Sequence, residues 1–205
     1  MAQTTSADPG IDEIELPAGL AEVFQRLGDR ETPPATLRDG FRIVQETFDR
    51  AAIELELADM YQSEPTRHAV HVDDRVEHVP CVMDAMIVAL ALDERPVEIV
   101  SQPPTGGETV EFFVADGTVT VVPESAVVSF GIAADDAEAA DLNDIREILN
   151  EDSAVPRTCT LINAFPDSDD YERWATDQSD WAVMELGVVD LVALSREAAD
   201  RYSHG

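Results

Sequence analysis

Lysine does not occur at any of the 205 positions of this sequence. All 13 basic side chains are therefore arginine, against 43 aspartate and glutamate residues, and the formal net charge is -30. Such a chain repels phosphate backbones and anionic lipid surfaces, which argues against a nucleic-acid or membrane-surface role. Acid excess without lysine is typical of proteins that stay soluble in molar salt, where charges are screened over about 3 Å. We therefore predict a halophilic protein, with an ordinary acidic protein as the alternative.

Long apolar runs and cysteines are also scarce. No stretch approaches the roughly 20 apolar residues of a membrane span, and residues 1–14 lack the basic and apolar parts of a signal peptide. We therefore expect a cytoplasmic protein with no membrane partner. Cys81 and Cys159 are the only cysteines, too few for a disulfide scaffold, so we expect both to be free thiols in a reducing compartment.

The remaining pattern predicts an α+β fold. Helical spacing of apolar residues indicates a small helical N-terminal region over 1–63, which begins with a loose tail. Residues 64–205 are predicted to form a second domain, a mixed or antiparallel sheet around a central helix, because hairpin-like strands alternate with helices. The clearest hairpin signal is the Asp116-Gly117 turn. The predicted helices are 16–27, 37–53, 80–92, 135–150, 167–178 and 188–202, and the predicted strands are 68–75, 96–101, 109–115, 118–123, 125–132, 158–165 and 181–187.

The helix predicted over 80–92 contains the first candidate site. It is expected to begin at Pro80 and to be central and buried, because it is apolar on nearly every face. Asp84 is its one ionisable side chain before Asp93, and a buried carboxylate needs a partner, a proton or a cavity. Cys81 lies one turn earlier on the same face, where the helix start favours a thiolate. The pair could exchange a proton; the alternative is an inert cysteine beside an aspartate that complements the helix dipole.

Cys159 is the second candidate, on the strand predicted over 158–165. An inert core thiol is one interpretation, and two thiolates that converge on a soft metal are the other. A zinc site at His68, His71 and His78 is disfavoured, because His68 and His71 have odd spacing on a strand and should face opposite sides.

Two segments carry a resemblance to a known family. The segments HAVHVDDRVEHVPCVMDAM and TCTLINAFPDSDDYERWA each contain one of the two cysteines, and both resemble motifs of the organomercurial (alkylmercury) lyases in order and separation. The segment WAVMELGVVDLVALSREAADR is similar to the C-terminal part of that family. The likeness runs from about His68 to the C terminus; residues 1–63 are shorter than the winged-helix-like region of the family and could be a reduced form of it.

The resemblance implies that Cys81 and Cys159 bind mercury and that Asp84 handles the proton and is a possible third ligand. The implied reaction is protonolysis of the carbon–mercury bond of R–Hg⁺ to a hydrocarbon and Hg(II) held between two sulfurs. No cofactor is implied beyond external small thiols, and mercuric reductase or cellular thiols are the implied acceptors of Hg(II). A non-catalytic relative that binds a soft metal or carries a thiol-bound ligand is the alternative, and a winged-helix regulator is disfavoured by the charge.

Overall fold

Two antiparallel sheets organise the chain, which is described from a computed structural model over residues 11, 13–51, 56–92, 95–132, 157–178, 181–200 and 202. The larger sheet has the strand order β2-β1-β3-β4-β5. The strand Val110–Ala115 alternates buried and more exposed residues, so that Phe112 faces the core while its neighbour Phe113 is exposed. The mixed α+β prediction is confirmed. The strands are β1 (His68–Val72), β2 (Arg75–Val79), β3 (Val97–Ser101), β4 (Val110–Ala115) and β5 (Thr118–Val122).

Two tight turns shape this sheet, one predicted and one missed. Asp116 and Gly117 both have positive φ values, 51° and 69°, as the short turn of a hairpin requires. The prediction of a single strand over 68–75 is wrong, because the chain reverses at Asp73, which has φ 53°, and returns as β2. Aspartate tolerates this left-handed conformation, so the turn forms without glycine.

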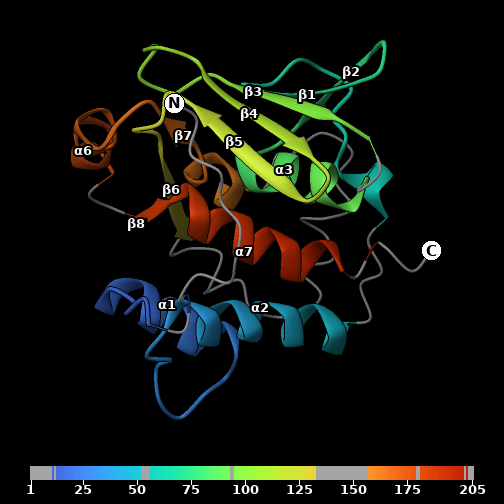
Figure 1. Ribbon diagram of the computed structural model, residues 1–205. Helices are drawn as coiled ribbons and strands as arrows, with labels where there is room; N and C mark the ends of the chain where they lie inside the picture. Colours follow the sequence, from blue (N-terminus) through green and yellow to red (C-terminus); the bar gives the residue numbers. More distant parts are fainter. Residues whose placement is uncertain are drawn as a thin grey trace.

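Helix α3 (Val82–Ala91) lies at the centre of the molecule. It packs on β1 and β3 on one side and on α7 (Val188–Ala199) on the other (Figure 1). The prediction of a buried central helix is confirmed, although the helix begins at Val82 rather than at Pro80. Cys81 is the N-cap residue with extended backbone angles, so Pro80 precedes the helix.

The smaller sheet has the strand order β7-β6-β8 and holds the segment of the second cysteine. The strand predicted over 158–165 is largely absent, because Arg157–Leu161 forms a 3-10 helix, η2, and β7 keeps only Ala164–Phe165. The ladder between β6 and β7 consists of the pairs of Val127 with Phe165 and of Val128 with Ala164. The other elements here are β6 (Val127–Ile132), α6 (Ser168–Thr176) and β8 (Ala182–Gly187).

The N-terminal helices share the core of the rest of the chain. Helices α1 (Ala18–Leu27) and α2 (Leu37–Ala51) precede the short η1 (Leu57–Met60). The rings of Phe24 in α1 and Phe130 in β6 stack with centroids 6.3 Å apart. A Cβ atom at Gly40 would lie 2.6 Å from the Phe24 ring, so glycine permits α1 and α2 to approach. Arg38 of α2 donates to Glu197 of α7 at 2.6 Å.

The helix predicted over 135–150 and nearly all of the predicted N-terminal tail lie outside the described residues. None of the described helices combines the length and the apolar character that crossing a membrane requires.

Candidate active site

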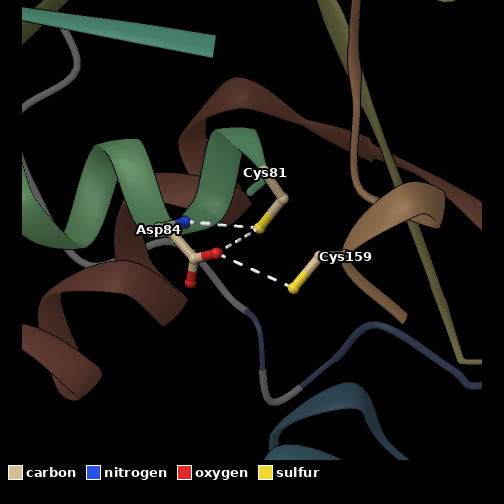
Figure 2. A group of neighbouring side chains, drawn as sticks. All are labelled: Cys81, Asp84 and Cys159. Carbon is tan, nitrogen blue, oxygen red and sulfur yellow. Dashed lines mark hydrogen bonds between the residues drawn. The ribbon is translucent and has the colours of Figure 1, made fainter. Parts of the chain in front are cut away.

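Cys81, Asp84 and Cys159 come together between the start of α3 and η2 (Figure 2). One donor atom from each residue lies within 4.8 Å of the other two. Both thiols donate to the same carboxylate oxygen, Oδ2 of Asp84, at 3.1 Å from Cys81 and 3.7 Å from Cys159. The structure thus brings all three predicted residues to one place.

The start of α3 fixes the first pair. Cys81 is 1% exposed, and as N-cap residue its sulfur accepts the backbone N–H of Asp84 at 3.4 Å. The thiol of Cys81 in turn donates to the carboxylate of Asp84. The two residues are therefore linked twice, and a proton can pass between sulfur and oxygen along a bond that already exists.

The second cysteine reaches the pair from a different part of the chain. Cys159 lies in η2 and is partly exposed. The backbone N–H of Ile162 donates to the carbonyl of Cys159 at 3.2 Å, and the N–H of Val82 donates to the carbonyl of Ile162 at 3.3 Å. The end of η2 is therefore bonded to the residue that follows Cys81.

Burial dominates the electrostatics of the site. It raises the pKa of the Asp84 carboxyl, an effect that the hydrogen bonds from Cys81 and Cys159 oppose. Burial also raises the pKa of the Cys81 thiol well above its ordinary value, and the contact with Cys159 and the charge of Asp84 act in the same direction. The expectation that the helix start favours a Cys81 thiolate is therefore wrong, because the N–H of Asp84 lowers the pKa of Cys81 less than these effects raise it.

The donor set suits a soft metal ion. Two sulfurs and one carboxylate oxygen converge, and thiolates select soft ions over magnesium or calcium. Metal–sulfur bonds are about 2.3 Å long for zinc. The two sulfurs lie within 4.8 Å of each other, so one ion could bind both. Within the described ranges, no other group of three histidine, cysteine or acidic side chains is arranged in this way.

The histidines are engaged elsewhere. His68 is buried on β1, its Nδ1 lies 2.8 Å from Ser101 Oγ, and burial lowers its pKa to about 4. His71 lies on the more exposed face of the same strand, as predicted. His78 accepts the backbone N–H of Thr66 at 3.4 Å through Nδ1. The zinc interpretation thus has no support in the described part of the chain.

Sequence reasoning missed the residue that holds the end of η2. Ser129 of β6 is fully buried and hydrogen-bonds to the backbone of Leu161 and Asn163. Its one available signal was a hydroxyl inside the apolar run AVVSFGI, where a buried polar group requires a partner.

Comparisons with known proteins find a family model and a solved structure that match this chain. The family model described as alkylmercury lyase matches residues 62–200, more than half of the chain. Among solved structures, the crystal structure of the mercury-bound form of MerB2 is similar, with 16% identity and a TM-score of 0.52. That match covers 92% of this chain and 93% of the other, and at this identity it concerns the fold. A sequence search of the curated proteins finds no match.

Proposed function

Because the chain belongs to the alkylmercury lyase family, we propose that Cys81, Cys159 and Asp84 carry out its reaction. The reaction is protonolysis of the carbon–mercury bond of an organomercury cation, R–Hg⁺. The observation that supports these roles best is the single carboxylate oxygen that accepts both thiols. A site that only bound a metal would need the two sulfurs, whereas protonolysis also needs an acid next to the reacting carbon.

The first step is capture of the substrate by sulfur. Asp84 accepts the proton of a thiol to which it is already bonded, and the resulting thiolate forms a sulfur–mercury bond with R–Hg⁺. Cys159 is the more exposed thiol, so an incoming substrate meets it before the buried Cys81. The buried pair Cys81 and Asp84 then lies behind the captured mercury.

The second step breaks the carbon–mercury bond. Coordination by the second sulfur weakens this bond, and the proton held at Asp84 is transferred to the carbon, which leaves as R–H. The raised pKa of Asp84 favours a carboxyl that keeps its proton until the carbon accepts it. In sum, R–Hg⁺ and two thiols give R–H, Hg(II) bound by two thiolates and one proton released to solvent.

A cleavage assay tests these roles. Purified protein in molar salt is incubated with methylmercury or phenylmercury and excess small thiol, and methane or benzene is measured by gas chromatography. We expect the parent protein to release hydrocarbon and Cys81→Ser and Cys159→Ser to fall to the rate of thiol buffer alone. Retention of mercury by the parent without release of hydrocarbon would instead identify a non-catalytic binder.

The site residues lie within 64–205, and we propose that this part carries the chemistry without a resident cofactor. Helices α1 and α2 pack against this part of the chain through the ring of Phe24 and through the ion pair of Arg38 with Glu197. The product Hg(II) must pass to other thiols, which we propose are small cellular thiols or those of mercuric reductase in the cytoplasm.

The charge of -30 leads us to propose a halophilic source. Self-repulsion of the carboxylates should weaken the fold in dilute buffer and should be screened in molar salt. Thermal unfolding measured from dilute to molar KCl checks this, and a midpoint that does not rise with salt would contradict it without affecting the chemistry.

A further inference from the structure

Where β6 and β7 separate, the side chain of Ser129 forms hydrogen bonds with the backbone of the turn that precedes β7. The ladder between β6 and β7 ends at the pair of Val128 with Ala164. At the next position, Ser129 Oγ accepts the N–H of Asn163 at 2.9 Å and donates to the carbonyl of Leu161 at 2.8 Å. The backbone N–H of Ser129 also donates to the carbonyl of Asn163 at 2.9 Å. Three bonds from one buried residue therefore hold the turn 161–163.

This turn is bonded to the segments of both cysteines. The N–H of its central residue, Ile162, donates to the carbonyl of Cys159, and its carbonyl accepts the N–H of Val82 beside Cys81. A shift of the turn would thus move η2 relative to the start of α3. The 3.7 Å contact of Cys159 with Asp84 depends on that relative position.

The strand is shaped to receive the turn. Gly131 lies two residues after Ser129, on the same face of β6. A Cβ atom at Gly131 would lie 3.1 Å from Cβ of Leu161 and 2.8 Å from a methyl carbon of Val183. The absent side chain lets Leu161, at the end of η2, approach the strand closely, and the hydroxyl of Ser129 fixes it there.

We infer that Ser129 is a positioning residue of the reaction, whose hydroxyl sets the place of the Cys159 sulfur relative to Cys81 and Asp84. The inference rests on the proposed function, in which both sulfurs must bind one mercury. Without the hydroxyl, the carbonyl of Leu161 and the N–H of Asn163 lose their partner in a buried site and the turn relaxes. Cys159 can still capture a substrate alone, but the second sulfur is no longer at bonding distance.

The test compares Ser129→Ala with Ser195→Ala. Both serines are 0% exposed, but the hydroxyl of Ser195 on α7 has no hydrogen-bond partner among the described residues, which makes it a matched control. The first readout uses phenylarsine oxide, whose arsenic bridges two thiols with loss of one water, against a competing small dithiol. We expect retention of the arsenical to weaken about 10- to 100-fold in Ser129→Ala, the usual effect of removing a residue that orients a metal ligand. Retention should be unchanged in Ser195→Ala.

The second readout is the kinetics of methylmercury cleavage at a temperature where both variants are folded. We expect kcat of Ser129→Ala to fall by the same order with a much smaller change in KM, because capture needs one sulfur and cleavage needs two. Ser129→Thr keeps the hydroxyl and should restore much of both readouts.

Parent-like arsenical retention and kcat in folded Ser129→Ala would overturn the positioning role. If Ser129→Ala does not fold, Ser129→Val replaces it and is compared with Ser129→Thr, which has the same shape but keeps the hydroxyl. Parent-like values in that folded variant would likewise overturn the inference. A parent protein that does not cleave methylmercury but retains the arsenical more tightly than Ser129→Ala does would refute the proposed function and support the placement of Cys159 by Ser129.

Discussion

Helices α3 and α6 begin in the same way and use the result differently. In α3 the N-cap Cys81 accepts the N–H of Asp84, and in α6 the N-cap Asp167 accepts the N–H of Asp170 at 2.8 Å. The third residue of each helix is thus an aspartate whose backbone N–H is bonded to the side chain of the N-cap residue. Two segments with the same local geometry therefore place a carboxylate in a largely enclosed position.

The partners of the two aspartates differ. Asp170, 4% exposed, accepts Thr105 Oγ1 at 2.7 Å and forms an ion pair with Arg173. Asp84 accepts two thiols and forms no ion pair with any described residue. Asp170 thus faces a cation, whereas Asp84 faces two thiols, with which a carboxyl group can exchange a proton. The helix start supplies the position, and the facing groups decide between a structural and a chemical role.

The largest expected effect is on the cleavage rate, which we expect to depend on Asp84 and not on Asp170. Asp84→Asn keeps the size of the side chain but removes the exchangeable acid proton. We expect Hg(II) binding by the sulfurs to persist while single-turnover cleavage falls on the order of a hundredfold or more, the scale of a positioned general acid. Rapid-quench measurement of hydrocarbon release checks this. A variant as fast as the parent would return Asp84 to the role of a charge at a helix start.

The counterpart change, Asp170→Asn, should alter stability and leave chemistry intact. It removes the charge that pairs with Arg173 and disturbs the bond from Thr105 in a buried position. We expect the free energy of unfolding to fall by about 1–3 kcal/mol and the cleavage rate of the folded enzyme to stay within about twofold of the parent. Chemical denaturation and the cleavage assay measure the two quantities, and a loss of rate in stably folded protein would contradict the comparison.

Sequence reasoning predicted the part of the site that depends on local geometry. Residues three apart at a helix start share a face, so Cys81 and Asp84 could be paired from spacing alone. Cys159 lies 75 residues beyond Asp84, and spacing cannot show that such residues meet; the resemblance to a family supplied that expectation.

Two of the errors arise from long-range contacts, and the missed strand β2 arises from a local turn. The segment 158–165 was predicted to be a strand, but Arg157–Leu161 forms a 3-10 helix whose end is hydrogen-bonded to Ser129 of β6, a contact that the segment itself does not reveal. The helix start indicated a Cys81 thiolate, but burial by the surrounding core has the opposite and larger effect. Strand β2 was missed because its turn uses aspartate rather than glycine.

The free energy of unfolding, measured as a function of pH, tests the raised pKa of Asp84. Because the folded-state pKa of Asp84 is raised, the unfolded chain loses this proton first as the pH rises above about 4. The free energy of unfolding then falls until the pH exceeds the folded-state pKa, by about 1.4 kcal/mol for each unit of difference. Asp84→Asn should therefore gain stability relative to the parent from pH 4 upward. Denaturation curves of both proteins across this pH range measure the effect. If the two free energies of unfolding changed with pH in parallel, the raised pKa of Asp84 would be refuted.

The smallest expected effect concerns salt. The pair of Asp170 with Arg173 is exposed on one side only, since the side chain of Arg173 is 71% exposed and that of Asp170 5%, so molar KCl should screen it in part. The destabilisation by Asp170→Asn should then shrink by about 0.2–0.5 kcal/mol. The rate defect of Asp84→Asn should not change with salt, because its partners are neutral thiols. Both quantities are measured in dilute and in molar KCl. A rate defect of Asp84→Asn that changed with salt would contradict this difference between the two aspartates.

The use of cysteine as the N-cap of α3 sets stability and activity against each other at position 81. Serine, threonine, aspartate and asparagine are the preferred residues there because a small oxygen acceptor satisfies the free N–H groups well, and the sulfur of Cys81 accepts its bond at 3.4 Å. Selection for folding alone would therefore favour an exchange for serine. A lineage released from exposure to mercury should drift to serine at this position while it keeps the fold, which makes a retained cysteine a mark of continued selection for the chemistry.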